Sequence, residues 1–250
     1  MALALMGVFV AVYFPDLQRG LPLVPTGSYY TDLFAAKNLP FGIADSLGSI
    51  LGISTASARV HFFAWGLFAF LTLGCAVICA RILALAELSP TLAKLSPTES
   101  IFLAIGSILI TGCFFAGQSI GYRGIFLLFV LPGLLALSRQ GRDKSVRLLA
   151  DFTSLVLLFL MWGECFRTNL IAGLDHFHVA ALRHGEILLD FWAIRELAWW
   201  WLISVLLAII VHFLLQSEMG ARVTSLLKQK RSRLARGLVE GPTGPLPGDR

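Results

Sequence analysis

The chain has 250 residues, of which 57% are hydrophobic and only 14% are charged, and its formal net charge is +5. Soluble domains contain about 25% charged residues, so this composition excludes a water-soluble globular protein. The basic residues cluster beside the ends of apolar runs. This placement argues against a nucleic-acid partner and is typical of a membrane protein oriented by its charges.

Residues 1–14 are apolar but shorter than the roughly 20 residues that a bilayer crossing requires. They lack a basic start and a small-residue cleavage site, so we interpret them as either a signal anchor or, preferably, the last part of a helix whose beginning is absent. Residues 15–59 are rich in Pro, Gly and Ser and predict an outer loop that could cover a site. Within this loop, 29–36 and 42–51 predict short helices along the membrane surface.

Four longer apolar runs match the length needed to cross about 30 Å of hydrocarbon. They cover residues 61–86, 101–119, 148–166 and 196–215. A further run over 123–138 predicts another crossing, in which Pro132-Gly133 allows a kink. Before the second run, Ser96-Pro97-Thr98-Glu99 predicts a helix start, with Pro at the first helical position and Glu in the first turn.

Two basic segments predict the orientation of the chain. Residues 139–147 carry four basic side chains, and 222–236 interleaves Lys and Arg with Leu in the pattern of a basic amphipathic helix on an anionic leaflet. Both segments should be cytoplasmic. This predicts that both termini are cytoplasmic, and that the loops 15–59, 117–123 and 167–195 are outside. The three tryptophans at 199–201 then mark a membrane interface.

The predicted fold is therefore an all-α polytopic membrane helical bundle with five or six transmembrane helices, six if residues 1–14 form one. Residues 1–220 form the transmembrane domain. Residues 221–250 form the basic amphipathic segment and a disordered cytoplasmic tail. The expected location is the bacterial inner membrane.

Arg123 and Tyr122 lie in a polar hairpin, 117–124, between two apolar runs. A guanidinium beside a phenol could clamp a phosphate by charge-assisted hydrogen bonds. The alternative is an arginine that contacts lipid head groups beside an aromatic anchor.

Two carboxylates fall inside the run over 148–166, where an unpartnered charge is costly. Asp151 is expected to pair with Arg147, four residues earlier on the helix, and Glu164 with Arg167. If Glu164 opens instead on the same outer cavity as Arg123, it could act as a general base or contact a substrate hydroxyl.

Asp175, His176, His178, His184 and Glu186 form the one cluster with metal-ligand chemistry. Histidines two apart project to the same side of a strand but diverge on a helix. We therefore favour the polar face of an interfacial helix, and predict no metal site. No motif for a nucleotide or haem cofactor appears, and no catalytic residue is predicted.

Two stretches resemble a known family. One reads Cys113-Phe114-Phe115-Ala116-Gly117-Gln118-Ser119-Ile120-Gly121-Tyr122-Arg123-Gly124-Ile125-Phe126-Leu127-Leu128, followed by Leu131-Pro132, and the other reads Phe34-Ala35-Ala36-Lys37-Asn38-Leu39-Pro40. They resemble the later membrane part of bacterial integral-membrane glycosyltransferases of the GT-C type, particularly glycosyltransferase family 87. The resemblance implies a polyprenyl-phosphate sugar as substrate, a reaction on the outer face, and Arg123 and Lys37 as ligands of the lipid phosphate.

In that family the catalytic acidic residues lie in an outer loop ahead of the region that aligns here. No catalytic role is therefore transferred to Asp16, Asp32 or Asp45. The resemblance implies the C-terminal half of such an enzyme, whether truncated, split from a catalytic partner or non-catalytic, with membrane lipids and partner membrane subunits as its other contacts.

Two other functions remain open. The first is a non-enzymatic accessory or scaffold subunit of a larger membrane complex, for which small residues permit close helix contact. These residues are Gly66, Gly74, Gly106 and Gly112. The second is a transporter, which should show broken helices in related halves, whereas this sequence has a single Pro-Gly break.

Overall fold

The structure is a computed structural model that describes residues 33–54, 57–116, 119–120, 125–176 and 184–217. The described residues form helices and one pair of very short strands, which confirms the predicted helical class. In chain order the elements are β1 (Leu33–Phe34), α2 (Asn38–Ile50), α3 (Ala58–Leu83), α4 (Leu88–Leu92), α5 (Pro97–Ala116), β2 (Ser119–Ile120), α6 (Leu127–Gln140), α7 (Lys144–His176) and α8 (His184–Gln216).

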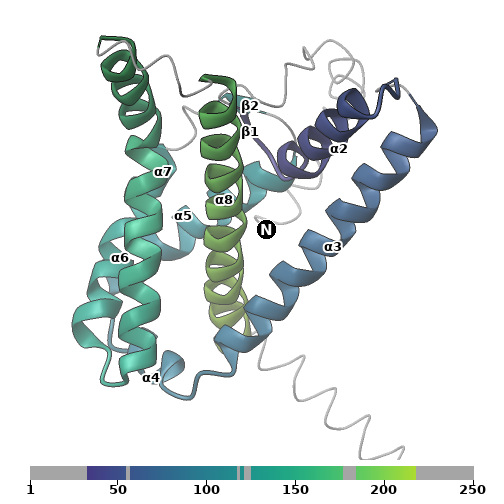
Figure 1. The fold of residues 1–250 in the computed structure, drawn as a ribbon. Helices are drawn as coiled ribbons and strands as arrows, with labels where there is room; N and C mark the ends of the chain where they lie inside the picture. Colours follow the sequence, from purple (N-terminus) through teal and green to yellow (C-terminus); the bar gives the residue numbers. More distant parts are fainter. Residues whose placement is uncertain (1–32, 55–56, 117–118, 121–124, 177–183, 218–250) are drawn as a thin grey trace, which may run out of the picture.

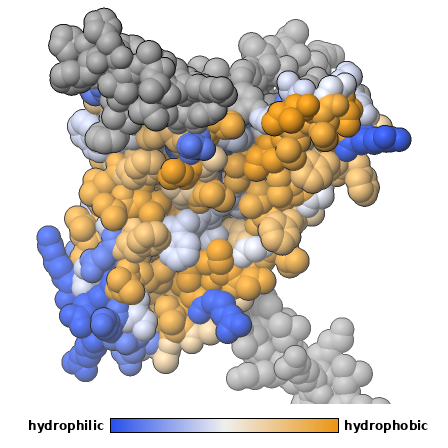
Figure 2. Space-filling model, in the orientation of Figure 1, coloured by the Kyte–Doolittle hydropathy of each residue, from blue (hydrophilic) through white to orange (hydrophobic). Residues whose placement is uncertain are grey.

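Helices α5 to α8 form a bundle, and α3 leans against α8 from one side (Figure 1). The strands and α2 lie at one end of this bundle, which we call the strand end. The turn between α6 and α7 lies at the opposite end, which we call the basic end because Arg139, Arg142, Lys144 and Arg147 are exposed there. Hydrophobic residues cover the middle of the face shown in Figure 2, and hydrophilic ones gather at the basic end.

Four helical segments among the described residues are long and apolar enough to cross a membrane. They are Ala58–Leu83, Pro97–Ala116, Lys144–Gly163 and Leu189–Gln216. Helix α6 has 14 residues and is about 21 Å long at 1.5 Å per residue, which is less than the roughly 30 Å of hydrocarbon. The predicted crossing over 123–138 is therefore a shorter helix among the described residues, and the predicted total of five or six spans stays a prediction.

The predicted helix start before α5 is confirmed. Glu99 Oε2 accepts hydrogen bonds from the backbone N–H of Ser96 at 2.9 Å and from its hydroxyl at 2.8 Å. The backbone N–H of Glu99 donates to Ser96 Oγ at 3.3 Å. Pro97 occupies the first helical position, where its missing N–H costs nothing. This reciprocal capping fixes the basic end of α5.

The connection predicted over 167–195 is helical in most of its described length. Helix α7 continues to His176, and α8 already begins at His184. A helix satisfies its own backbone hydrogen bonds wherever it lies, so polar residues can prolong an apolar span past the hydrocarbon. Of the two surface helices expected before α3, residues 42–51 are largely helical within α2. The described part of 29–36 instead contains β1, whose partner strand lies far along the chain.

The prediction that residues 199–201 mark a membrane interface is also wrong. Trp199 and Trp200 are buried, and α8 begins 15 residues before Trp199. The ring centre of Trp199 lies 4.3 Å from that of Phe34, and the ring of Trp200 lies 5.2 Å from that of Phe114 in an edge-on contact. These indoles fill the space between α8, α5 and β1, where large aromatic surfaces contribute most to packing.

Candidate functional site

The two stretches that carry the family resemblance lie side by side at the strand end. Strand β1 pairs antiparallel with β2, in a register that places Phe34 opposite Ser119. The backbone N–H of Ala36 donates to the carbonyl oxygen of Phe114 at 2.8 Å, and the rings of Phe34 and Phe114 are 5.4 Å apart. Segments about 80 residues apart in the sequence thus meet in one small hydrogen-bonded unit.

Lys37 lies immediately after this unit, at the residue that precedes α2. Its side chain is exposed, and its ammonium nitrogen lies 5.1 Å from the ring centre of Trp65 on α3. A cation over an indole face is held by the ring's quadrupole while its other sides stay open to an anion. The next residue, Asn38, is completely buried, so the backbone beside Lys37 is held in place by packing.

The other predicted site residues are placed only in part. Tyr122 and Arg123 lie outside the described residues, two and three positions after the end of β2. Glu164 belongs to helix α7, but its side chain is outside the description. In the β1–β2 register, Ile120, the last residue before the stretch that leads to Arg123, lies opposite Leu33, whereas Lys37 follows the other end of β1.

The histidine cluster is divided between two helix ends. Asp175 and His176 end α7, His184 and Glu186 begin α8, and His178 lies outside the described residues. The side chains of the four helical residues are not described either. Within the part of the chain that the structure describes, no three His, Cys, Asp or Glu side chains are placed to hold a metal ion.

A buried ion pair at the strand end was missed by sequence reasoning. Arg195 Nη2 lies 3.0 Å from Glu196 Oε1, and the two residues are 7% and 0% exposed. In the sequence, Arg195 and Glu196 stand at the start of an apolar run, where charged residues usually mark the polar end of a membrane span. Because α8 starts 11 residues earlier than Arg195, both charges fall inside the packed part of the helix.

The ion pair is close to the strand unit. Trp199, whose ring contacts Phe34, is one helical turn from Arg195, or about 6 Å along the axis of α8. Charged side chains at membrane depth are costly and usually face a bundle interior or a cavity, where they mark functional positions. The strand end therefore contains a buried charge pair and an exposed cation on adjoining elements.

Asp45 on α2 is the acidic side chain that adjoins α3. Partial burial raises the pKa of its carboxyl group, and the charge of nearby His61 on α3 offsets part of this rise. Burial disfavours the ionised form because the carboxylate loses solvating water. The position adds a titratable group to the strand end, about 10 Å along α2 from Asn38 at 1.5 Å per residue.

The predicted pairing of Asp151 with Arg147 is not found. The carboxylate of Asp151 instead accepts a hydrogen bond from the hydroxyl group of Ser138 on α6. Helices α6 and α7 pack together next to their short connection, so the hydroxyl reaches the carboxylate across the interface. Asp151 therefore ties two helices together near the basic end and is remote from the strand end.

No protein-family model matches the chain, and comparisons with curated proteins and with solved structures give no significant match. The fold and the candidate site define a helical protein whose described residues include four helical segments capable of spanning a membrane. One end of its bundle joins two distant segments beside a buried ion pair.

Proposed function

We propose that this protein binds the phosphate of a polyprenyl-phosphate sugar at the strand end, as the C-terminal membrane half of a GT-C-type glycosyltransferase would. The observation that carries the proposal is the β1–β2 pairing, because it joins the two stretches that resemble that family. Lys37 and Arg123 would neutralise the phosphate, and Tyr122 would donate to it. Glu164 would contact a sugar or acceptor hydroxyl. No residue is assigned as the catalytic base.

We also propose that the chain crosses a bacterial inner membrane with its basic end in the cytoplasm. Exposed basic residues gather at that end, as they do on the cytoplasmic side of membrane proteins. Helix α5 ends at the strand end, whereas α7 begins at the basic end. The connecting chain must therefore return across the bilayer, and α6 makes a fifth crossing despite its length.

A radiolabelled polyprenyl-phosphate sugar tests the proposal by binding and transfer assays on the full chain in vesicles. Arg123→Ala and Lys37→Ala should each weaken binding at least about tenfold. A hydrogen bond to a charged group contributes about 1.5–3 kcal/mol, and about 1.4 kcal/mol corresponds to a tenfold change in affinity. Lys37→Arg keeps the charge and should restore binding. Arg142→Ala removes an exposed cation at the opposite end and should leave binding unchanged.

Equal binding by all four variants would refute the strand end as the phosphate site. Absence of donor binding by the unaltered chain, even when it is co-expressed with the gene upstream of its own, would refute the glycosyltransferase proposal as a whole.

One observation favours the second candidate, an accessory subunit of a larger membrane complex. Helix α3 packs on α2 and α8, but most of its surface is exposed, with Phe62 83% and Phe70 69% accessible. A Cβ atom added at Gly66 or Gly74 of this helix would meet nothing within 4 Å. A partner helix could therefore approach closely along this face.

Native purification in mild detergent separates the two candidates. An accessory subunit should co-migrate with other membrane proteins in fixed proportion, and Gly66→Leu should release it from them. Solitary migration of the native protein would count against the accessory role.

A further inference from the structure

Helices α7 and α8 enclose an apolar groove on the surface of the bundle. Its volume is about 540 Å³. The lining comes almost entirely from hydrophobic side chains, among them Phe152, Val156 and Phe159 of α7 and Ile194, Ala198 and Trp201 of α8. In a membrane the groove faces hydrocarbon, so its natural contents are apolar chains.

The aromatic walls of the groove are held in place by contacts of their own. The indole N–H of Trp201 donates to Thr153 Oγ1 at 3.4 Å, and its ring lies 5.3 Å from that of Phe152 in an edge-on contact. Nearer the strand end, the rings of Phe159 and Phe191 are 5.6 Å apart. Side chains fixed in this way preserve the shape of a groove without a ligand.

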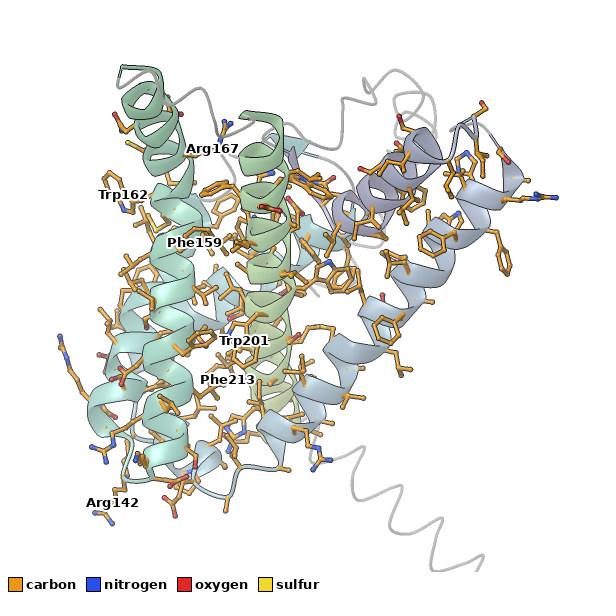
Figure 3. All side chains as sticks on the ribbon, viewed as in Figure 1. Arg142, Phe159, Trp162, Arg167, Trp201 and Phe213 are labelled. Atoms are coloured by element: carbon orange, nitrogen blue, oxygen red, sulfur yellow. The ribbon has the colours of Figure 1, made fainter. Side chains whose placement is uncertain are left out.

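A cation lies beyond the end of the groove that is nearer the strand end. Arg167, which is half-buried, stands two turns beyond Phe159 on α7. Figure 3 shows Arg167, Phe159 and Trp201 in that order between α7 and α8, whereas Trp162 projects to the outer side of α7. The eight residues from Arg167 to Phe159 correspond to about 12 Å along the helix.

We propose that this groove holds one acyl chain of an anionic phospholipid, whose phosphate lies at Arg167. One leaflet contributes about 15 Å of hydrocarbon depth, half of the roughly 30 Å core. A chain that starts at the level of Arg167 therefore passes Phe159 and reaches Val156 within the groove. Arginine suits the head group because its guanidinium matches phosphate oxygens in a two-pronged geometry. Glu164, which is proposed above to contact the sugar or the acceptor, lies on α7 between Phe159 and Arg167. The lipid proposal nevertheless does not depend on donor binding, because it rests on the groove and Arg167 alone.

The lining distinguishes a lipid chain from a partner helix as the occupant. Helices in membranes associate through small residues that let backbones approach, whereas seven of the eight residues that line this groove have larger apolar side chains, three of them aromatic. A second groove, of about 270 Å³ between α3 and α8, shows the contrast because Ala76, Ala80, Cys75 and Cys79 line it. That groove suits a helix, and the aromatic groove suits a flexible chain.

Phosphatidylglycerol with a photoreactive group near the end of one acyl chain tests the proposal on the full chain in phosphatidylcholine vesicles. Cross-links mapped by mass spectrometry should concentrate at Val156, Phe159 and Ile194, and unlabelled phosphatidylglycerol should suppress them. Ala198→Trp fills the groove and should lower this cross-linking about tenfold. Ala69→Trp places the same side chain at an exposed position of α3 and should not.

The head group is tested by Arg167→Gln, with Arg142→Gln at the basic end as the matched control. The first variant should reduce the preference for phosphatidylglycerol over phosphatidylcholine at least about tenfold, and the control should keep it. If Ala198→Trp does not fold, Ile194→Trp fills the groove from an exposed position.

Three results would overturn the proposal. Cross-links spread evenly over α3 and α7 would show bulk lipid only, and an unchanged lipid preference in Arg167→Gln would remove the head-group contact. Protein–protein cross-links across the groove would show that a second helix occupies it. Because the probe is a phospholipid, these results are independent of polyprenyl-donor binding.

Discussion

The Arg195–Glu196 pair places two opposite charges in the packed interior of the strand end. Replacing a buried ion pair by apolar side chains is often neutral, but removing one partner leaves a charge without its counterion. Stability and function can therefore be separated at this pair. A single substitution tests the burial of the charges, and a double substitution tests what the charges are for.

Glu196→Ala should lower the free energy of unfolding by up to about 3–5 kcal/mol, because the buried Arg195 then loses the carboxylate that lies 3.0 Å from its guanidinium. The double variant Arg195→Met, Glu196→Leu should recover most of this loss. Unfolding followed by circular dichroism during titration with a denaturing detergent measures both. Donor binding is then measured on the stable double variant. Unchanged binding would show that the ion pair is structural, and lost binding would show that the pair contributes to function.

Arg139→Met, at an exposed position, is the control for removing a cation alone and should leave stability unchanged. A Glu196→Ala variant as stable as the unaltered chain would show that the pair is not buried as described.

At the scale of the elements, α6 is held against α5 by glycines on both helices. A Cβ atom added at Gly106 of α5 would lie 2.7 Å from Val130 Cγ2 and 3.2 Å from the backbone nitrogen of Val130. One added at Gly133 of α6 would lie 2.8 Å from Leu103 Cβ. These approaches are too close for any side chain, so the packing of the short helix α6 depends on the two glycines.

Gly106→Ala and Gly133→Ala should each destabilise the bundle by about 1–3 kcal/mol, the usual cost of overpacking. Gly112→Ala on the same helix α5 is the matched control, because its Cβ would meet nothing within 4 Å. It should be neutral or stabilising by up to about 1 kcal/mol, since alanine favours a helix over glycine. The detergent concentration at the unfolding midpoint ranks the variants, and equal midpoints for all three would contradict the close α5–α6 contact.

The capping interaction at the start of α5 should contribute less to the free energy of unfolding than the two glycines. Ser96→Ala removes the acceptor for the N–H of Glu99 and one of the donors to its carboxylate, and should cost about 1 kcal/mol. Thr98→Ala changes an exposed neighbour and serves as the control in the same unfolding titration. Loss of stability in the control equal to that in Ser96→Ala would remove the cap as the cause.

At the scale of the whole molecule, the distribution of charge gives the helical bundle a direction. Arg139, Arg142, Lys144 and Arg147 are exposed around the α6–α7 turn, and the strand unit lies at the opposite end. Since cytoplasmic loops are enriched in Lys and Arg, the proposed phosphate site faces outward only if the basic end faces inward.

Single cysteines in a chain whose four native cysteines are replaced test this direction. Cysteine at Ser49, exposed on α2 at the strand end, should react with a membrane-impermeant maleimide in intact cells. Cysteine at Ser145, exposed at the basic end, should react only after the membrane is permeabilised. The opposite pattern would invert the orientation and place the candidate phosphate site in the cytoplasm.

Apolar run length predicted the four long helices, because hydrocarbon thickness fixes the length of a span. Local chemistry predicted the Ser96–Glu99 cap. The continuation of α7 and α8 could not be predicted in this way, since polar residues beyond the hydrocarbon leave no periodic apolar signal. The short α6 also differs from its prediction because composition alone does not show where a helix begins.

The candidate site was less predictable than the fold. Lys37 was proposed through the family resemblance, and its role stays a prediction, but the pairing of β1 with β2 joins residues whose contact no local sequence pattern reveals. The Arg195–Glu196 pair was missed because its burial depends on where α8 starts and on the aromatic rings around Trp199. Interpretation of those tryptophans as interfacial failed for the same reason.

The ring of Phe34 contacts Phe114 and Trp199, which follow it by 80 and 165 residues. At about 5–20 residues per second, a ribosome adds 165 residues in roughly 8–33 s. During biosynthesis Phe34 therefore enters the membrane region well before its last neighbour exists. The end that carries the candidate site is completed last, so translation that stops before α8 yields helices that lack the Phe34–Trp199 contact.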